Sequence, residues 1–451
     1  MSSDKALNKL AQVIRIIDII YQYKQYIEEI PAMAVGLIYK DKVLFAKGYG
    51  HADINKKIPV TGKTCFRIAS ISKIFTTVAI MQLVEANKLN LDEKVTTYLS
   101  WFVSGVDATL QKITIRQLLT HTSVISRDGD TPHWTEHEFP DLDHIKKYIS
   151  TLRLPFPIHS RWKYSNFGFS ILGAVIEQVS GKTYEEYIHK NICQRLEMTL
   201  TSSILTEQIK RHLAVGWGRK ICSQKREAFP NIETNAMASA TGLSSCINDL
   251  LKFVSSQFFE NSILLSDKSK KELLKPHWVN KKDDISQAIG FHTFKSGGRT
   301  IYYHSGGFQG YRCNISFDIK RSIGVVTLTD VLGIDPKDYA KRVFDVINYI
   351  GKNSFVKNNE TLCKYEGVYR DIWEDHAVMT IGNNLICFDP NALEPLSHAS
   401  ILEPVKENEF LIKGSDEVEI AGELAKYQET KKGKRFRWGA AYSYKINPIE
   451  E

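Results

Sequence analysis

The chain has 451 residues, of which 43% are hydrophobic and 24% are charged, and its formal net charge is +8. These values are typical of a globular protein with more than one domain and ample length for a buried core. The basic residues form short, scattered clusters, so a solvated surface explains the charge better than a nucleic-acid site. No stretch of 18 uninterrupted apolar residues occurs, so we expect no membrane span.

Cysteine usage and the N-terminal residues bear on the compartment. The seven cysteines are isolated and odd in number, without Cys-x-x-Cys pairs or zinc-ligand spacing, so neither a disulfide framework nor a metal site is expected. Residues 13–21 look apolar but contain Arg15 and Asp18, and no small-residue cleavage site follows. They predict an amphipathic helix rather than a signal peptide. Reduced thiols without an export signal predict a cytoplasmic location.

The first part of the chain predicts a hairpin followed by helices. Residues 32–39 and 42–49 are β-rich runs joined by a short turn, which predicts a β-hairpin. Residues 70–86 carry apolar side chains at helical spacing and predict an amphipathic helix that begins at Ser70. Residues 115–125 predict a short helix that runs into a loop.

Residues 128–158 are polar and aromatic and contain several histidines. No compact ligand pattern such as His-Glu-x-x-His occurs among them, so a metal site is the weaker alternative. We expect an irregular, mobile loop over a cleft.

Further helices and then strands follow. An amphipathic helix is predicted to end at Ser180-Gly181, another to start near Thr183, and a third to span residues 247–258 with Ser244-Ser245 as its cap. The later predictions are strands at 287–294, 299–304, 311–318 and 322–329 and a helix at 336–350. One early hairpin and a late set of antiparallel strands imply an α+β fold whose sheet is assembled from both ends of the domain. An all-helical insertion at about residues 85–285 separates them.

The rest of the chain predicts a second domain. Residues 351–360 are polar and indicate a linker. Short β-rich runs with turns follow, for example 365–369 and 417–420, and predict a small antiparallel barrel or sandwich. We therefore expect one domain at 1–352 and a second at 353–451. The second domain is expected to cover the cleft or to mediate oligomerisation.

Ser70 and Lys73 form a Ser-x-x-Lys pattern at the start of the predicted helix. Three residues apart on a helix, they share a face, so the lysine amine can take the serine hydroxyl proton. The backbone N–H groups of the helix start favour the negative charge on an attacked carbonyl. The same pattern occurs at Ser2–Lys5, Ser160–Lys163 and Ser354–Lys357. Only the match at Ser70 has a strand-to-helix setting with partner motifs downstream.

Tyr164-Ser165-Asn166 is the only Tyr-x-Asn in the chain. Tyr164 can share the serine proton with Lys73, and a nearby ammonium is expected to lower the tyrosine pKa toward the working range. Asn166 can donate to a substrate carbonyl and accept from Lys73. Taken alone, the motif is equally well explained as a turn with a packed tyrosine.

His304-Ser305-Gly306-Gly307 ends a predicted strand. The glycine pair lets a substrate backbone lie close to the strand edge, and the Gly307 N–H can join that of Ser70 as an oxyanion donor. Taken alone, His304 is more simply a structural histidine. The rival Lys295-Ser296-Gly297-Gly298 places its glycines where a hairpin must turn.

The order of these motifs resembles that of the serine β-lactamase and penicillin-binding-protein superfamily. The closest branch is the class C-like one, with D-alanyl-D-alanine carboxypeptidases, D-aminopeptidases and family VIII esterases. Its motifs Ser-x-x-Lys, Tyr-x-Asn and Lys/His-x-Gly are matched at Ser70–Lys73, Tyr164–Asn166 and His304–Gly306. The resemblance covers residues 20–350 and implies the β-lactamase/transpeptidase-like sheet flanked by helices. The C-terminal part resembles the lipocalin-like appendage of some members.

Three positions depart from that family pattern. Val124 stands where the family usually has glycine, so its loop is expected to be reshaped, and Ile158-His159 replaces a common Pro-Gly. His304 replaces the lysine of a dedicated β-lactamase. A lysine stays charged and can hold a substrate carboxylate, whereas histidine titrates near neutral pH.

The resemblance implies a serine hydrolase that works through an acyl-enzyme on an amide or ester. The expected catalytic residues are Ser70, Lys73, Tyr164 and His304, and the expected substrate-binding and oxyanion residues are Asn166, Ser305, Gly306 and Gly307. No metal or organic cofactor is required, and the expected partner is a small-molecule or peptide substrate, not a nucleic acid. A peptidase and an esterase remain open, as do a β-lactamase proper, a catalytically silent scaffold or sensor, and a homo-oligomer.

Overall fold

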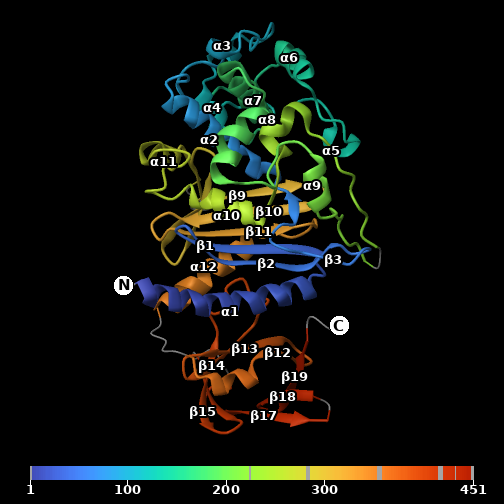
Figure 1. Ribbon diagram of the computed structural model, residues 1–451, viewed down its shortest axis with the longest axis vertical. Helices are drawn as coiled ribbons and strands as arrows, with labels where there is room; N and C mark the ends of the chain where they lie inside the picture. Colours follow the sequence, from blue (N-terminus) through green and yellow to red (C-terminus); the bar gives the residue numbers. More distant parts are fainter. Residues whose placement is uncertain are drawn as a thin grey trace. The chain divides into compact units, whose positions relative to one another are not determined.

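The computed structural model describes residues 3–222, 225–280, 285–352, 358–414, 420–431 and 433–447. These residues fold into two compact units (Figure 1). Residues 31–337 form one unit, and residues 1–30 together with 338–451 form the other. Within the described residues, none of the helices combines the length and apolar character that crossing a bilayer requires.

An antiparallel sheet is the centre of the 31–337 unit. Its strand order across the described residues is β3-β2-β1-β11-β10-β9-β8-β7-β6. The strands are β1 (Ala32–Tyr39), β2 (Lys42–Asp53), β3 (Ile58–Pro59), β6 (Trp278–Asn280), β7 (Ile285–Gln287), β8 (His292–Ser296), β9 (Arg299–Phe308), β10 (Tyr311–Asp318) and β11 (Ile323–Thr329). The early hairpin β1–β2 meets the late strands where β1 pairs with β11, with Val35 opposite Thr327. The prediction of a sheet built from both ends is confirmed.

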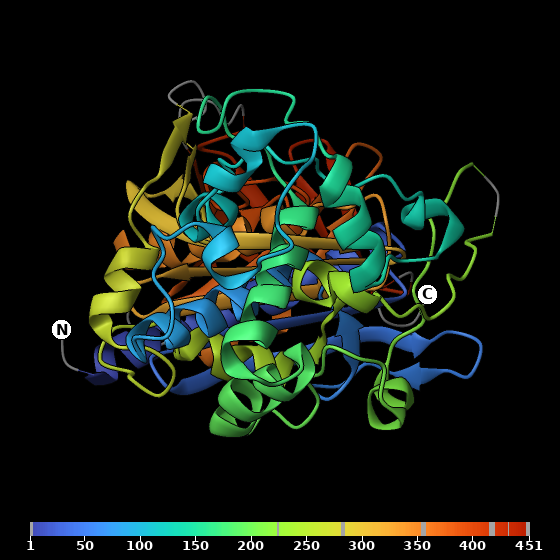
Figure 2. The same ribbon diagram turned by 90° about the horizontal axis from the view of Figure 1, so that it is seen from above.

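Helices lie over the sheet of this unit, as the view from above shows (Figure 2). They are α2 (Ser72–Glu85), α3 (Val95–Tyr98), α4 (Ile115–Leu119), α5 (His133–Glu136), α6 (Leu142–Thr151), α7 (Asn166–Ser180), α8 (Tyr184–Ile188), α9 (Glu207–His212), α10 (Ile247–Ser255) and α11 (Asp267–Leu273). The helix α10 packs on β1 and β11. A two-stranded pair, β4 (Cys65–Arg67) with β5 (Ser244–Cys246), brings the start of α2 next to the chain before α10.

Several local predictions are wrong. Ser244-Ser245 does not cap α10, because both residues lie in β5 and the N-cap residue is Cys246. Residues 128–158 contain the helices α5 and α6 instead of an irregular loop. The helix α2 is not amphipathic: apolar side chains and the polar Thr76 and Thr77 are buried on all its faces. The helices α7 and α8 and the 238–242 turn pack against it, and Phe75 stacks on Phe253 of α10.

The second unit contains a closed barrel of eight strands in the order β12 to β19. The strands are β12 (Gly367–Arg370), β13 (Asp375–Ile381), β14 (Asn384–Phe388), β15 (Ser400–Lys406), β16 (Glu409–Lys413), β17 (Leu424–Thr430), β18 (Gly433–Trp438) and β19 (Ala441–Ile446). Tyr369, Phe410, Tyr427 and Phe436 fill much of its interior. The prediction of a small C-terminal barrel is confirmed.

Two long helices belong to the same unit as the barrel. These are α1 (Ser3–Ile27) and α12 (Pro336–Lys352). The helix α1 contacts β12 and β13, the Arg15 guanidinium pairs with the Glu366 carboxylate at 2.5 Å, and the Tyr21 and Tyr339 rings stack. The domain boundary at 352/353 stays a prediction. Residues 353–357 of the predicted linker and 417–419 of a predicted strand lie outside the described residues.

Candidate active site

Ser70 lies in a single 3-10 turn, Ala69–Ile71, between β4 and α2. Ala69 has a φ of +49°, a left-handed conformation that costs a residue with a Cβ atom about 1–2 kcal/mol. Strand β9 passes directly beside this turn, and a Cβ atom at Gly306 would overlap the Ile68 carbonyl oxygen. The absence of a side chain at Gly306 therefore lets β9 approach the segment that carries Ser70.

Lys73 is fully buried and lies next to Ser70. Its Nζ atom is 3.1 Å from Ser70 Oγ and 2.7 Å from both Asn166 Oδ1 and the Ala240 carbonyl oxygen. Burial lowers the pKa of the Lys73 amine well below its ordinary value. A neutral amine has two N–H donors and one lone pair. In that neutral form the two shorter contacts would take both donors and leave the lone pair for the Ser70 hydroxyl, whereas in the ammonium form Lys73 Nζ donates to Ser70 Oγ.

Tyr164 donates its hydroxyl hydrogen to Ser70 Oγ at 2.8 Å. Burial raises the tyrosine pKa above its ordinary value of 10.0. The expectation that a lysine ammonium would lower this pKa is therefore wrong, because burial of the phenol is the largest cause of the shift. The Lys73 amine lies 4.9 Å from the Tyr164 ring centre, and burial lowers its own pKa. Tyr164 is a neutral phenol, suited to supply a proton rather than to remove one.

Asn166 is the first residue of α7, whose start is fixed by Ser165 as its cap: Ser165 Oγ accepts from the Gly168 N–H at 2.8 Å. The Asn166 Oδ1 atom faces Lys73, and its Nδ2 donates to Asp128 Oδ1 at 2.5 Å. Asp128 thus fixes the amide orientation that presents an acceptor to the amine. It is a positioning residue that the sequence motifs did not single out.

We expect Asp128→Asn to lower turnover about tenfold, because a small misplacement of Lys73 weakens proton transfer. The Asp128 charge also raises the Lys73 pKa. Removing it should therefore lower that pKa further and shift the acid limb of kcat/KM to lower pH. Asp130→Asn is the matched control, since Asp130 lies in the same segment but pairs with His144. An unshifted limb in Asp128→Asn would contradict the positioning role.

His304 lies in β9 and only 3% of it is exposed. Its Nδ1 is 2.7 Å from the Ser305 carbonyl oxygen, which assigns the hydrogen to Nδ1. Burial, with His292 and Lys73 nearby, lowers the pKa of His304 well below 6.5. The expected titration near neutral pH is therefore wrong, and His304 is a neutral imidazole. The ring centre of His292 lies 5.3 Å away, and burial lowers its pKa to about 4.

The sequence predicted a strand that ends at His304. The strand β9 instead continues to Phe308. On the β8 side, the ladder within the described residues ends at Tyr303 opposite His292, while on the other side Gly307 pairs with Arg312 of β10. The Ser305 hydroxyl accepts from Asn314 Nδ2 at 3.0 Å. The half-paired edge beyond Tyr303 is consistent with the predicted oxyanion and substrate roles, which stay predictions.

Aromatic side chains pack around Tyr164. The ring of His121 lies 4.5 Å from that of Tyr164 and 5.9 Å from that of Trp162, between centres. His121 Nδ1 accepts from the Ser165 N–H at 3.1 Å, and burial lowers the His121 pKa well below 6.5. A neutral His121 therefore fixes both the Tyr164 ring and the start of α7.

The two loop departures both fall on left-handed residues. Val124 has a φ of +57° and His159 a φ of +62°, a region that glycine adopts freely and β-branched residues rarely adopt. The His159 N–H donates to the Thr122 carbonyl at 2.9 Å. The loop at Val124 thus has the backbone conformation that suits glycine.

His159→Gly is expected to stabilise the protein by about 0.5–1 kcal/mol. Relief of the left-handed backbone is worth about 1–2 kcal/mol, and the greater freedom of glycine in the unfolded chain offsets about 0.4–1 kcal/mol of it. His159 is exposed and its ring makes an edge contact with Trp278 at 6.2 Å between centres, so little packing is lost. Thermal unfolding measures the change, and His144→Gly, inside α6, should shift the midpoint the other way. A lower midpoint for His159→Gly would refute the strain at this position.

The structure brings Ser70, Lys73, Tyr164 and Asn166 into one hydrogen-bonded group, with His304 close to Lys73. Sequence reasoning did not assign Asp128, His121 or the Ala240 carbonyl to it. Asp128 lies in the segment predicted to be a mobile loop, and His121 lies in the segment predicted to be a short helix that runs into a loop. Residues 238–242 form a single π-helical turn, a feature common at functional sites, and no sequence pattern marks it.

Comparisons with known proteins identify the family of the chain. The Beta-lactamase family model matches residues 22–345. The Flp protein of Staphylococcus aureus (strain N315) is 30% identical over 201 residues, 45% of this chain and 40% of Flp. The PbpX protein of Bacillus subtilis (strain 168) is 27% identical over 277 residues, 60% of this chain and 66% of PbpX. The matches thus span less than two thirds of either relative.

A solved structure shares the fold. The octameric penicillin-binding protein homologue from Pyrococcus abyssi superposes with a TM-score of 0.64 at 21% identity, covering 95% of this chain and 99% of that one. The family model covers most of the chain, and the fold agrees with it. The chain therefore belongs to the beta-lactamase family, within the superfamily of serine β-lactamases and penicillin-binding proteins.

Proposed function

We propose that the protein is a serine hydrolase that cleaves an amide or ester bond through an acyl-enzyme on Ser70. The observation that carries this proposal is the placement of Ser70 Oγ between Lys73 Nζ at 3.1 Å and the Tyr164 hydroxyl at 2.8 Å. A base and an acid therefore contact the same nucleophile, as acyl transfer requires.

The proton movements follow from the protonation states. The Ser70 hydroxyl proton passes to the neutral Lys73 amine as the oxygen attacks the carbonyl, and the N–H groups of Ser70 and Gly307 hold the oxyanion. Tyr164 gives its proton to the leaving group and regains one from the Lys73 ammonium. Asn166 orients Lys73 and substrate, and His304 assists at the substrate edge. Water then attacks the acyl group, which releases Ser70.

The substrate class follows from the charge at His304. A lysine at this position can hold a substrate carboxylate, whereas a neutral imidazole supplies hydrogen bonds without charge. We therefore favour a peptidase or esterase whose substrate has no carboxylate at this place over a β-lactamase proper. A short p-nitrophenyl ester and a D-amino-acid p-nitroanilide distinguish the esterase from the peptidase.

Covalent labelling tests the proposal. The protein is treated with a fluorophosphonate, its intact mass is measured, and the modified peptide is mapped. We expect one adduct, on Ser70, together with turnover of the ester or the anilide. No adduct and no turnover, or an adduct elsewhere, would contradict the acyl-enzyme and favour a scaffold or sensor.

We also propose that the chain forms a homo-oligomer, because the Pyrococcus abyssi homologue that shares its fold along nearly the whole chain is described as octameric. Light scattering coupled to size-exclusion chromatography measures the mass in solution. A mass equal to that of one chain, 51.4 kDa, at all concentrations would contradict it.

A further inference from the structure

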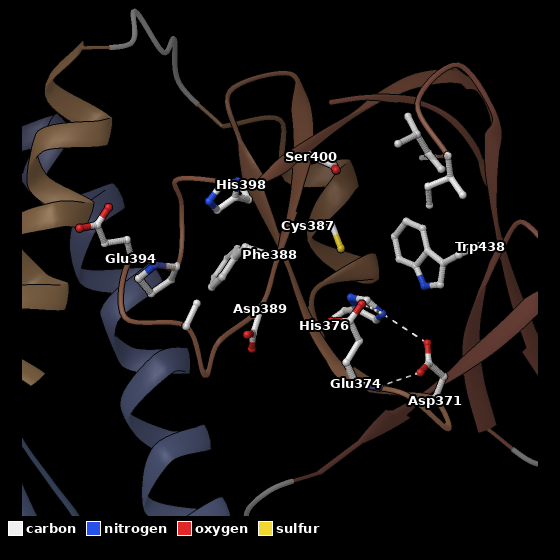
Figure 3. A pocket seen from close by; sticks show the side chains of 14 residues that line it. Asp371, Glu374, His376, Cys387, Phe388, Asp389, Glu394, His398, Ser400 and Trp438 are labelled. Atoms are coloured by element: carbon white, nitrogen blue, oxygen red, sulfur yellow. Dashed lines mark hydrogen bonds and ion pairs between the residues drawn. The ribbon is translucent and has the colours of Figure 1, made fainter. Parts of the chain in front are cut away.

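A cavity of about 510 Å³ lies inside the C-terminal barrel (Figure 3). Its lining residues place it at one end of the barrel. This is the end that carries the connections β12–β13, β14–β15, β16–β17 and β18–β19. Its volume is in the range of small-molecule sites. Apolar side chains such as Phe388 and Ile412 form part of the wall.

The polar lining of this cavity is acidic. It includes Asp371, Glu374, Asp389 and Glu394, and the described lining residues include neither lysine nor arginine. The negative charge of Glu394 is paired with Lys341, whose Nζ atom lies 3.0 Å from Glu394 Oε1. His376 also lines the cavity, with its Nε2 atom 3.3 Å from Asp371 Oδ2 and 3.8 Å from Glu374 Oε1. The described lining gives Asp371, Glu374 and Asp389 no lysine or arginine partner. Asp371 accepts from the N–H groups of Trp373 and Glu374, and these bonds favour its ionised form.

Trp438 is a second, independent sign of a ligand. Only 8% of this residue is exposed, and within the described residues its Nε1–H has no hydrogen-bond acceptor. A buried donor without a partner is costly. Trp162 and Trp217 share this status, but neither lines the cavity. In Figure 3 the nitrogen edge of the indole faces the space beside Asp371 and His376, and the Trp438 and His376 ring centres are 5.7 Å apart. The donor is therefore available to an acceptor in the cavity.

The two observations together define the ligand chemistry. A metal ion does not fit, because among the described residues no three His, Cys, Asp or Glu side chains are placed to bind one. A carboxylate or phosphate would face like charges. An apolar ligand would leave the Trp438 donor unpaired. An organic cation with an acceptor atom near its charge satisfies both the acidic wall and the indole.

We propose that this barrel cavity binds a small organic ammonium that carries a neighbouring carbonyl oxygen, the chemistry of a free α-amino group beside an amide. The ammonium faces the carboxylates of Glu374 and Asp389, and the carbonyl accepts from Trp438 Nε1. The site belongs to the barrel unit alone, so it does not depend on the chemistry proposed for Ser70.

Calorimetric titration of the full chain with four probes tests the ligand class. Alaninamide has both the ammonium and the amide carbonyl, and isopropylamine has only the charge. N-acetylalaninamide lacks the charge, and alanine has a carboxylate in place of the amide. We expect alaninamide to bind best, the other three about tenfold or more weakly, and its affinity to fall with added salt. Equal affinity for N-acetylalaninamide would overturn the proposal.

Variants locate the site. Trp438→Phe keeps an aromatic ring but removes the N–H, so alaninamide affinity should fall to that of isopropylamine. Glu374→Gln should weaken both cations, and it perturbs the fold little because 60% of this side chain is exposed. Glu407→Gln is the matched control, in the β15–β16 turn at the opposite barrel end, where Glu407 pairs with Lys364.

If alaninamide bound outside the barrel cavity, the variants would change its affinity in a different way. Thermal unfolding establishes that Trp438→Phe is folded, and if it is not, Glu374→Gln decides alone. In Ser70→Ala the affinity for alaninamide should be unchanged. Loss of binding in Ser70→Ala with retention in Trp438→Phe and Glu374→Gln would place the ligand at the candidate active site and overturn the proposal.

Discussion

Ser70→Ala is expected to lower kcat on an ester or anilide substrate by a factor on the order of 10⁴ to 10⁶. Alanine removes the oxygen that forms the acyl-enzyme, while Lys73 and Tyr164 keep their other contacts. The alternative of direct attack by water lacks the positioned nucleophile. Steady-state rates and the mass of the fluorophosphonate-treated variant measure the effect.

The chain offers a matched control for this substitution. Ser160–Lys163 has the same Ser-x-x-Lys spacing, but Ser160 is exposed and its N–H closes a turn onto Pro157. Ser160→Ala should keep full turnover and labelling. If Ser70→Ala retained more than about a tenth of the activity while Ser160→Ala lost it, the nucleophile would be misassigned.

Lys73→Met is expected to lower kcat/KM by about 10²- to 10⁴-fold. This is the range that general base catalysis contributes. Methionine is of similar length and apolar, so it fits the buried site but cannot take the Ser70 proton. Lys88→Met serves as the control, because Lys88 is exposed just beyond the end of the same helix. Equal activity of the two variants would exclude Lys73 as the base.

The pH profile separates a base from a packing role for Lys73. The amine acts only when unprotonated, and burial lowers its pKa, so the wild type should stay active at pH values where an ordinary lysine is protonated. Activity should fall on the acid side as the amine gains its proton. In Lys73→Met this acid limb should disappear. Because His304 is neutral, it should add no limb near its ordinary pKa of 6.5.

The sequence predicted the parts of the site that are encoded locally. Ser70 and Lys73 are one helical turn apart, and Tyr164 and Asn166 flank the start of α7, so short motifs were sufficient to identify them. The contacts of Asp128 and of the Ala240 carbonyl depend on how distant segments meet. Because every residue has a backbone carbonyl, no sequence pattern could single out the one at Ala240.

The protonation states of site residues could not be predicted from the sequence, because they also depend on how distant segments pack. The predicted behaviour of Tyr164 and His304 rested on ordinary pKa values and on one neighbouring charge, whereas burial is the largest cause of both shifts. Burial depends on the whole packing around a group. The same limit applies to α2, where apolar spacing suggested one buried face and the fold buries every face.

Topology was predicted as far as pairing follows from chain order. The early hairpin and the late strands were placed in one sheet because both have apolar runs and short turns, and β1 does pair with β11. The β-rich runs alone are compatible with a barrel or a sandwich, and the resemblance favoured the barrel. The difference lies in the closing contact between β12 and β19, residues far apart in the chain.

The burial of α2 on every face bears on how this protein can diverge. A change in this helix alters the core and the placement of Ser70 together, so most such changes are lost through instability before they are tested for activity. The segments that carry Val124 and His159 hold left-handed residues, and His159 is exposed to solvent. New acyl preferences are therefore expected to arise by variation in these segments rather than in α2, which follows the turn that carries Ser70.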